Sequence, residues 1–438
     1  MPGWACASVK TRGPFFLTAL PMLTFFSVTS TAQEGTIALA STKIEWKEAG
    51  VAHSALWRSE RSALPPRRIV EADDTMAADT AYRLACEGTG LLWRGDFQNA
   101  RQLVQALARR IDKPPKASKL VRVATKKAAD NAISGVPAGQ DFHLHRQAQS
   151  QRARVLGMVL IEFGADYSID LRRAPDAKQA CTEAWGPAGE AAMPSVASLR
   201  ELMGVISAHE WRKKGVEIPA LGKSPNNRIH PHYGVFSPVR GEYVDLVANA
   251  PLPANPGSKF VAFDIGTGTG VLAAVLALRS EVDQVVATDL DPRALECARE
   301  NIYRLRLPNP VKVMQADLYP EGLASVIVCN PPWLPARPGS PLEGAVYDEG
   351  GRMLLGFLSS LAAHLAPGGE GWLILSNFAE QLGLRTRAEL LAAIKSSNLK
   401  VLGRIDAKPD HPKAADASNP LHKARAAEVT SLWRLGPA

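Results

Sequence analysis

Residues 264–333 contain three groups whose types and spacing suit a site that binds a nucleotide and acts on a nitrogen atom. The first is the glycine-rich turn Asp264-Ile265-Gly266-Thr267-Gly268-Thr269-Gly270. The second is Asp289, which follows at about the 20-residue distance that separates such a turn from a ribose-binding acid in a βαβ unit. The third is the corner Asn330-Pro331-Pro332-Trp333, which combines an amide, two prolines and an aromatic ring. Their order predicts a single ligand site.

The glycine turn lies between an apolar run at residues 260–263, typical of a buried parallel strand, and a helix-forming run at residues 271–278. Glycine lets the backbone turn sharply and lets a ligand approach where a Cβ would obstruct it. The G-x-G-x-G spacing and the preceding Asp264 differ from the G-x-G-x-x-G pattern of dinucleotide-binding dehydrogenases. The alternative is a tight strand–helix connection that binds no ligand.

Acidic residues follow the next two strand-like runs. Asp289 ends a β-favouring run, and a carboxylate there can accept hydrogen bonds from both hydroxyls of a ribose. Asp291 is the alternative acid, although the following Pro292 favours Asp291 as the cap of the next helix. Asp317 follows a run at residues 311–314, and it is either a ligand contact or an ordinary loop aspartate.

The Asn-Pro-Pro-Trp corner follows an apolar, strand-like run at residues 325–329. Two consecutive prolines fix φ and remove two backbone donors, so the chain leaves the strand in one direction. An exocyclic amino group or a side-chain amide has two N–H donors, which the Asn330 Oδ1 and the Pro331 carbonyl can accept. Trp333 offers a flat face for stacking a base or an amide plane. The alternative is a proline turn that closes a strand, with a tryptophan in the core.

Together, these groups resemble class I S-adenosylmethionine-dependent methyltransferases with an Asn-Pro-Pro-aromatic motif, in particular the HemK-like and small-domain ribosomal-RNA methyltransferases. The resemblance implies S-adenosylmethionine as the cofactor, with the glycine turn at its methionine end, Asp289 at the ribose and Asp317 at the adenine amino group. The implied catalytic residues are Asn330, Pro331, Pro332 and Trp333. The implied cofactor-binding residues are Asp264, Gly266, Gly268, Gly270, Asp289, Asp317 and Asn330.

The segment at residues 230–243 is similar to the piece that precedes the first strand in those families, where it covers the cofactor and the substrate pocket. The substrate-binding residues implied by this resemblance are Phe236, Pro238, Glu242 and Trp333. His230 and His232 could suggest a metal, but no Cys or carboxylate cluster accompanies them in the sequence. No metal site is therefore predicted.

The predicted fold class is α/β. For residues 226–438 the resemblance implies a seven-stranded, doubly wound Rossmann-like sheet whose last pair of strands forms a reversed hairpin. Residues 408–425, rich in Pro, Ala, Asp, Asn and Lys, are expected to form a loop beside the active-site rim. Residues 72–225 are expected to form a mainly helical N-terminal accessory domain. The helical patterns lie at residues 75–87, 96–111, 152–163 and 198–213.

The first 71 residues have features of a targeting segment. Lys10 and Arg12 precede an apolar stretch at residues 15–28, and Ser30-Thr31-Ala32 resembles a cleavage site. The stretch is too short and too interrupted for a membrane span, and S-adenosylmethionine is a cytosolic cofactor. We therefore expect a start codon assigned too far upstream, with order beginning near Ala72, and an organellar address is the alternative. The expected location is cytoplasmic, with no stable membrane association.

The excess positive charge lies outside the predicted catalytic domain. From residue 231 onward the chain has 20 Lys and Arg against 21 Asp and Glu, whereas the first 230 residues hold 31 against 22. The concentration is highest at Arg109, Arg110, Lys113, Lys116, Lys119, Arg122, Lys126 and Lys127. Such a segment favours a polyanionic partner such as RNA, and the alternative is a solvated helix face with a linker. The five cysteines form no CxxC pair, which fits a reducing compartment.

These patterns predict an N-methyltransferase that acts on an exocyclic amino group of a nucleic-acid base, with ribosomal or transfer RNA as its partner. The alternative is N5-methylation of a glutamine in a protein such as a release factor, because the same corner chemistry serves both. The basic N-terminal half and Trp333, where the glutamine enzymes have tyrosine, favour a base. A domain that binds cofactor or RNA without reacting is a third hypothesis, which the complete set of site residues disfavours.

Overall fold

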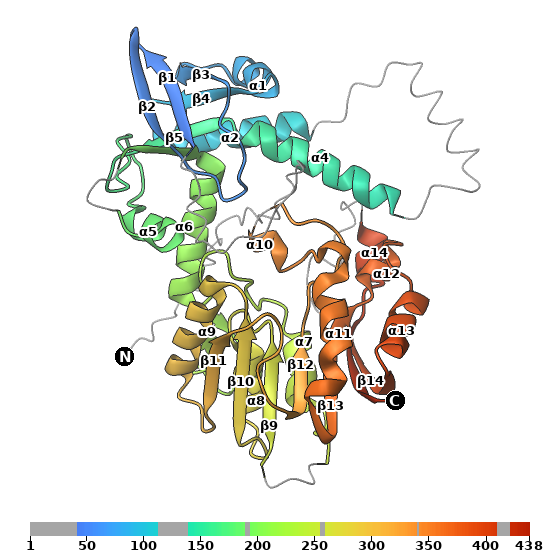
Figure 1. Ribbon diagram of the computed structural model, residues 1–438. Coiled ribbons are helices and arrows are strands. Elements are labelled where there is room, and N and C mark those ends of the chain that lie inside the picture. The colour runs from blue at the N-terminus through green and yellow to red at the C-terminus, as the bar shows by residue number, and fades with distance from the viewer. Residues whose placement is uncertain (1–41, 113–138, 189–192, 255–258, 340, 410–420) are drawn as a thin grey trace, which may run out of the picture.

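The computed structural model describes residues 42–112, 139–188, 193–254, 259–339, 341–409 and 421–438. They form an N-terminal unit (residues 42–215) and a C-terminal unit (residues 216–438), connected through helix α6 (Leu199–Lys214) (Figure 1). The signal-like stretch at residues 15–28 and most of the basic segment, from Lys113 to Lys127, lie outside the described residues.

The C-terminal unit is built on a seven-stranded sheet in the order β11-β10-β9-β12-β13-β15-β14. The strands are β9 (Val261–Ile265), β10 (Gln284–Asp289), β11 (Val311–Gln315), β12 (Ala324–Cys329), β13 (Leu365–Ser376), β14 (Leu399–Ala407) and β15 (Thr430–Pro437). Neighbouring strands are parallel except at β15, which runs antiparallel to both β13 and β14. The predicted seven-stranded sheet with a reversed strand near its end is confirmed.

Helices cover both faces of this sheet, as the alternation of buried residues requires. In β9, Ala262 packs into the layer of α7, α8 and α9, whereas Phe263 packs into the opposite layer of α11 and α13. The helices of the unit are α7 (Glu242–Asn249), α8 (Val271–Ala277), α9 (Pro292–Leu305), α10 (Pro341–Gly344), α11 (Arg352–His364), α12 (Phe378–Gln381), α13 (Arg387–Ser396) and α14 (His422–Ala426), with the 3-10 turns η1 (Pro219–Leu221) and η2 (Glu349–Gly351). The sheet is therefore doubly wound.

The core of the C-terminal unit begins before the expected boundary at residue 226. The short strands β7 (Val216–Glu217) and β8 (Arg228–Ile229) form an antiparallel pair directly after α6. Val216, Ile218 and Leu221 are buried in the same core as α7 and α8. The connection between the two units therefore lies at the end of α6.

The N-terminal unit is built on a mixed six-stranded sheet in the order β1-β2-β6-β5-β4-β3. The strands are β1 (Lys43–Glu48), β2 (Val51–Trp57), β3 (Arg68–Ala72), β4 (Thr89–Trp93), β5 (Val159–Phe163) and β6 (Ser195–Ser198). The helices are α1 (Ala78–Cys86), α2 (Phe97–Ile111), α4 (Gln140–Leu156), α5 (Lys178–Trp185) and α6. The core formed by α1, α2, α5 and α6 includes side chains from one face of the sheet. The prediction of a mainly helical domain is therefore not confirmed, because these helices pack on a six-stranded sheet.

The error arose at short apolar runs, for which periodicity cannot distinguish a buried strand from a buried helix. Residues 152–163, predicted as one helix, contain the end of α4, a break at Gly157 and the strand β5. The expectation that order begins near Ala72 is also wrong, because β1, β2 and most of β3 precede that residue. Trp46 and Ile44 of β1 are buried against Leu160, which holds this early segment on the sheet.

The N-terminal unit lies over the carboxyl end of the C-terminal sheet, where β10 leads into α9 (Figure 1). Arg293, in the first turn of α9, forms an ion pair of 3.3 Å with Glu60 of the N-terminal unit. On α4, Arg146 Nη2 donates a hydrogen bond of 2.7 Å to the carbonyl of Arg337. Phe142 of the same helix is buried in a cluster with side chains from the C-terminal unit. These contacts fix one unit against the other.

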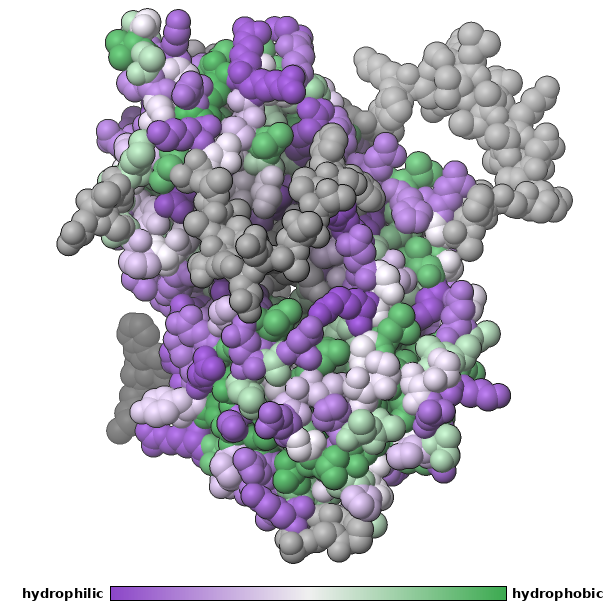
Figure 2. All heavy atoms as spheres, in the orientation of Figure 1, coloured by the Kyte–Doolittle hydropathy of each residue, from purple (hydrophilic) through white to green (hydrophobic). Residues whose placement is uncertain are grey.

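The surface differs between the two units on the face drawn in Figure 2. Hydrophilic residues cover most of the N-terminal unit there, and apolar residues are more frequent on the C-terminal unit. Within the described part of the chain, no helix is both long and apolar enough to cross a bilayer.

Candidate active site

The three groups singled out in the sequence meet at the carboxyl edge of the central strands. Ile265 of β9 pairs with Thr288 of β10 on one side and with Cys329 of β12 on the other. The next residues of the three strands are Gly266, Asp289 and Asn330. Because parallel strands in this register end together, the glycine turn, the acid and the corner leave the sheet side by side. This edge is where open α/β sheets bind their ligands.

Asp264 anchors the glycine turn from inside the protein. Its side chain is only 1% exposed, and Oδ2 accepts hydrogen bonds from Thr267 Oγ1 at 2.6 Å and from the backbone N–H of Ala273 at 3.0 Å. The two bonds connect the end of β9 to the start of α8. Burial, and to a smaller extent the neighbouring Asp289, raise the pKa of Asp264 to about 6 against the lowering effect of these bonds.

The three glycine positions of the turn differ in what surrounds them. Gly266 has a φ of +71°, and a Cβ there would lie 2.3 Å from Cε of Met353. Gly270 has a φ of +81° and packs against the backbone of Ala298. Gly268 has a φ of +55°, but a Cβ there would meet nothing within 4 Å. The backbone at Gly268 therefore faces open space, as a ligand-facing turn requires.

Asp289 ends β10 and reaches across to the glycine turn. Its Oδ2 accepts from the backbone N–H of Gly268 at 2.9 Å, and its Oδ1 accepts from the N–H of Asp291 at 3.0 Å. Burial raises the pKa of Asp289. Asp291 caps α9 by accepting from the backbone N–H of Arg293, with Pro292 in the first turn, as the sequence suggested. The geometry thus separates the two acids into a site residue and a helix cap.

Asp317 lies in the loop after β11 and is brought to the same edge by its neighbours. The N–H of Ala316 donates to the carbonyl of Asp289 at 3.2 Å. The Asp317 carboxylate itself is 58% exposed and forms an ion pair of 2.7 Å with Arg352. Its expected contact with an adenine amino group remains a prediction.

At the corner, the side chains of Asn330 and Trp333 bind one another. Trp333 Nε1 donates a hydrogen bond of 2.9 Å to Asn330 Oδ1. Pro331 is buried, and Pro332 is half-buried, between them. A carbonyl oxygen has two lone pairs, so the Asn330 oxygen keeps one acceptor position after binding the indole. The bond holds the amide in one orientation.

A guanidinium group lies over the Trp333 ring. Arg240 Cζ is 5.0 Å from the centre of the Trp333 ring. The same guanidinium is held by Glu242 at 2.6 Å and by Glu428 at 3.1 Å. Glu428 also accepts from Ser376 Oγ, at the end of β13, at 2.7 Å. This network holds the indole plane in place. No pattern in the sequence indicated Arg240 or Glu428 as part of it.

The three residues expected to cover the site differ in their surroundings. Glu242 is connected to the corner through Arg240, and Pro238 is buried. Phe236 is 37% exposed. The roles of Phe236, Pro238 and Glu242 in substrate binding remain predictions.

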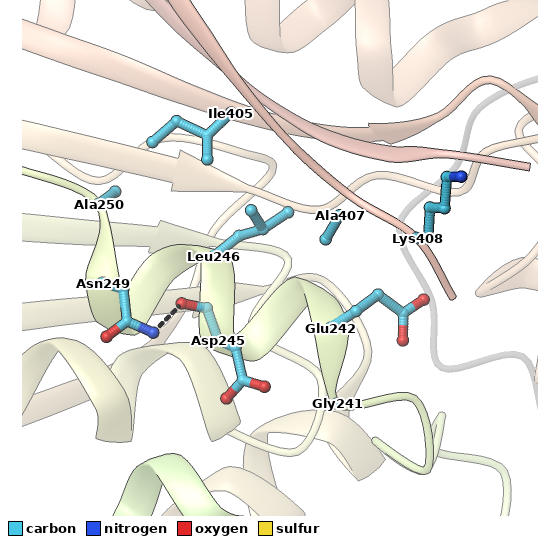
Figure 3. Close-up of a pocket in the computed structure, with 9 residues that line it drawn as sticks. All are labelled: Gly241, Glu242, Asp245, Leu246, Asn249, Ala250, Ile405, Ala407 and Lys408. Carbon is cyan, nitrogen blue, oxygen red and sulfur yellow. Dashed lines mark hydrogen bonds between the residues drawn. The ribbon is translucent and has the colours of Figure 1, made fainter. Parts of the chain in front are cut away.

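Glu242 also borders a pocket of about 550 Å³ between α7 and the end of β14 (Figure 3). The residues that line it are Gly241, Glu242, Asp245, Leu246, Asn249, Ala250, Ile405, Ala407 and Lys408. In Figure 3 the side chain of Leu246 lies between α7 and the strand that bears Ile405 and Ala407. The pocket adjoins the corner network through Glu242. It is separate from the carboxyl edge of the sheet, because the glycine turn and Asn330 are not among its lining residues.

Two further residues behind the corner were missed because no motif marks them. Tyr347 pairs with Leu334 through a β-bridge, and it is 5% exposed. Asp348 accepts hydrogen bonds from the backbone N–H groups of Met353 and Leu354, and so caps α11. The two glycines before that helix, both with positive φ, were the signal in the sequence for a sharp turn at this point.

Residues 226–383 match a family model described as the methyltransferase small domain. The chain is 38% identical over 126 residues to a release factor glutamine methyltransferase of Moorella thermoacetica, an alignment that covers 27% of this chain and 44% of that protein. It is 32% identical over 120 residues to a ribosomal protein L11 methyltransferase of Vibrio campbellii, covering 27% and 40%.

A third relative is a tRNA1(Val) (adenine(37)-N6)-methyltransferase of Glaesserella parasuis serovar 5, which is 36% identical over 83 residues, covering 18% of this chain and 35% of that protein. The chain thus spans less than half the length of each of these relatives. The segment matched by the family model contains the glycine turn, Asp289, Asp317 and the Asn330–Trp333 corner. These findings support a methyltransferase domain in this part of the C-terminal unit and the use of S-adenosylmethionine.

Proposed function

We propose that this protein is an S-adenosylmethionine-dependent N-methyltransferase that acts on an exocyclic amino group of a base in RNA. The observation that carries the proposal is the register of β10, β9 and β12, which sets the glycine turn between Asp289 on one side and Asn330 on the other. A cofactor and an amino group bound at these positions would meet at one edge.

The residues of the edge fit the cofactor. The open space at Gly268 accommodates a ligand against the backbone, and the Asp289 carboxylate, fixed by two backbone N–H groups, retains lone pairs for the two ribose hydroxyls. Asp264 places a carboxylate below the turn, where it would attract the amino group of the methionine portion. When bound, S-adenosylmethionine supplies an electrophilic methyl group.

The corner would prepare the nitrogen for attack. The free lone pair of Asn330 Oδ1 and the Pro331 carbonyl would accept the two N–H groups of the substrate, which turns the nitrogen lone pair toward the methyl group. The Trp333 ring, held by Arg240 and by its bond to Asn330, provides a face on which the base can stack. Positioning supplies much of the rate. As the bond from the methyl carbon to nitrogen would form, its bond to sulfur would break, and the extra proton on the nitrogen would then pass to solvent.

N5-methylation of a protein glutamine is the second candidate. It is favoured by the alignment with a release factor glutamine methyltransferase, and the same two acceptors would bind a side-chain amide. The indole of Trp333 and the excess positive charge of the first 230 residues favour a base in a polyanion. The relative that acts on a transfer-RNA adenine is compatible with the same choice.

The test is methyl transfer from tritiated S-adenosylmethionine to an extract of cells that lack the gene. The labelled material is divided and treated with ribonuclease or with protease. Label lost on ribonuclease treatment is the expected result. Label lost on protease treatment would replace the proposal with glutamine methylation, and absence of label with measurable cofactor binding would indicate a binding domain.

A further inference from the structure

A buried side-chain amide on α9 binds the glycine turn and the segment that precedes the covering residues. Asn301 is 0% exposed. Its Nδ2 donates a hydrogen bond of 3.0 Å to the carbonyl of Thr269, which belongs to the glycine turn. Its Oδ1 accepts from the backbone N–H of His230 at 2.8 Å, and Nδ2 also donates to the His230 carbonyl at 3.3 Å. A buried amide is costly unless it is hydrogen-bonded, so these backbone groups are what an amide serves at this position.

The carbonyl of Thr269 depends on this amide because helix α8 does not use it. The first carbonyl that α8 binds is that of Gly270, which accepts from the N–H of Ala274. The N–H of Ala273, one helical turn after Thr269, donates to the Asp264 carboxylate. Thr269 is only 3% exposed, so water is a poor substitute. Removal of the amide would leave a buried acceptor unpaired, which costs more than an average hydrogen bond contributes.

Asn301 and Asp289 hold the glycine turn at two neighbouring residues. Asp289 accepts from the backbone N–H of Gly268 at 2.9 Å, and Asn301 binds the carbonyl of the next residue. Gly268 is the position of the turn at which the backbone faces open space. Ala298, three residues before Asn301 and on the same face of α9, packs against Gly270. The place of the ligand-facing backbone is therefore fixed from both sides.

Through His230, the same amide is connected to the end of the N-terminal unit. His230 Nδ1 lies 2.6 Å from the carbonyl of Arg212 in the last turn of α6. Since a carbonyl oxygen only accepts, Nδ1 bears the hydrogen and donates it. Arg212 Nη2 also donates to the carboxylate of Glu300, the residue before Asn301, at 3.1 Å. The end of α6 is thus attached to α9 at the turn that holds the glycine loop.

We propose that Asn301 is a positioning residue for the cofactor, which holds the Gly268–Thr269 backbone in place for S-adenosylmethionine and connects it through His230 to the end of α6. Without the amide, every residue expected to contact the cofactor would be present, but the turn would no longer be fixed on the side of α9. Cofactor affinity should therefore fall, whereas methyl transfer at saturating cofactor should be retained. This inference rests on the proposed function, from which it takes S-adenosylmethionine as the cofactor.

The test measures S-adenosylmethionine binding to the full chain by isothermal titration calorimetry in wild type, Asn301→Ala and Asn301→Asp. Asn301→Asp keeps the size of the side chain and the acceptor for the His230 N–H, and it removes the donor to Thr269. Each variant is expected to raise the Kd about fivefold or more, as for the loss of one neutral hydrogen bond. In methyl transfer to total RNA from cells that lack the gene, the KM for cofactor should rise in parallel, and kcat should stay close to the wild-type value.

Asn309 provides a matched control at the opposite end of α8. Its Nδ2 donates to the carbonyls of Ala277 and Arg279 at 3.0 and 3.1 Å, so it also binds backbone groups next to that helix, away from the glycine turn. Asn309→Ala and Asn309→Asp should lower the melting temperature, as the Asn301 variants do, and should keep the wild-type Kd. All Kd values are compared at a temperature at which circular dichroism shows each variant to be folded.

A wild-type Kd in the two Asn301 variants would overturn the positioning role. An equal rise of Kd in the Asn309 variants would overturn it as well, because the effect would then reflect general destabilisation. Label found in protein alone, in the assay of the proposed function, would refute the RNA substrate and would leave the Kd comparison valid. The two failures are therefore distinguishable.

Discussion

Replacement of Asp289 by asparagine is the most informative perturbation of the cofactor site, because it keeps shape and removes charge. In the structure, each carboxylate oxygen accepts one backbone N–H, from Gly268 at 2.9 Å and from Asp291 at 3.0 Å. Two lone pairs remain for the ribose hydroxyls. In Asp289→Asn, the side-chain NH2 is only a donor. It would face either a backbone N–H, with which it cannot bond, or a ribose hydroxyl that must then accept rather than donate.

The expected loss follows from the bonds that change. A hydrogen bond to a charged group contributes about 1.5–3 kcal/mol, so loss of one such bond should weaken S-adenosylmethionine binding by about 10- to 150-fold. The affinity is measured by isothermal titration calorimetry at neutral pH with wild-type protein and the variant. Turnover at saturating cofactor should change less than the affinity.

Asp291→Asn is the matched control, two residues away. Asparagine caps a helix as well as aspartate does, so α9 and cofactor affinity should both be retained. Unchanged affinity in Asp289→Asn, or a larger loss in Asp291→Asn, would refute the assignment of Asp289 to the ribose.

The remaining predictions concern the glycine turn. Since the pKa of Asp264 is about 6, cofactor affinity should fall as the pH drops below that value, and Asp264→Asn should remove this dependence in a fluorescence titration. The folded-state pKa exceeds the 3.8 of an unfolded aspartate, so protonation stabilises the fold; wild type should gain up to about 3 kcal/mol relative to Asp264→Asn between pH 7 and 4. Gly266→Ala should lower the free energy of unfolding by about the 1–2 kcal/mol of left-handed strain, because the only close atom that its Cβ would meet is the flexible end of the Met353 side chain, which can move aside. Gly350→Ala, with a φ of +68° and open space, should show a similar loss in the same denaturation assay, and a clearly larger loss in Gly266→Ala would show that Met353 cannot move aside.

Much of the C-terminal fold followed from local patterns in the sequence. The strands β9, β10 and β12 are continuous apolar runs that end in Gly, Asp or Asn-Pro, and a strand buried on both faces leaves this pattern. The N-terminal sheet did not follow, because β4 and β5 are five-residue apolar runs next to true helices. Only long-range pairing, as between Leu91 and Val159, distinguishes them from helical segments, and such pairing leaves no local signal.

The residues of the candidate site fall into the same two groups, those with a local pattern in the sequence and those without one. The glycine turn, Asp289 and Asn330 could be predicted because each follows its own strand directly and the strands share an edge. Arg240 and Glu428 could not, since they reach the corner from distant parts of the chain, and Tyr347 could not, since no motif marks its pairing with Leu334. Their roles follow from an ion pair, a ring contact and a β-bridge, and none of these contacts corresponds to a fixed spacing of residues in the sequence.

The corner is the centre of the account, and Asn330→Ala tests it most directly. We expect this variant to bind S-adenosylmethionine as wild type does, because Gly268 and Asp289 are untouched. Methyl transfer to RNA at saturating cofactor should fall by a factor of about 10² or more, comparable to loss of one positioned hydrogen-bonding group at a reacting centre. Transfer equal to wild type in Asn330→Ala would contradict the proposed chemistry of the corner.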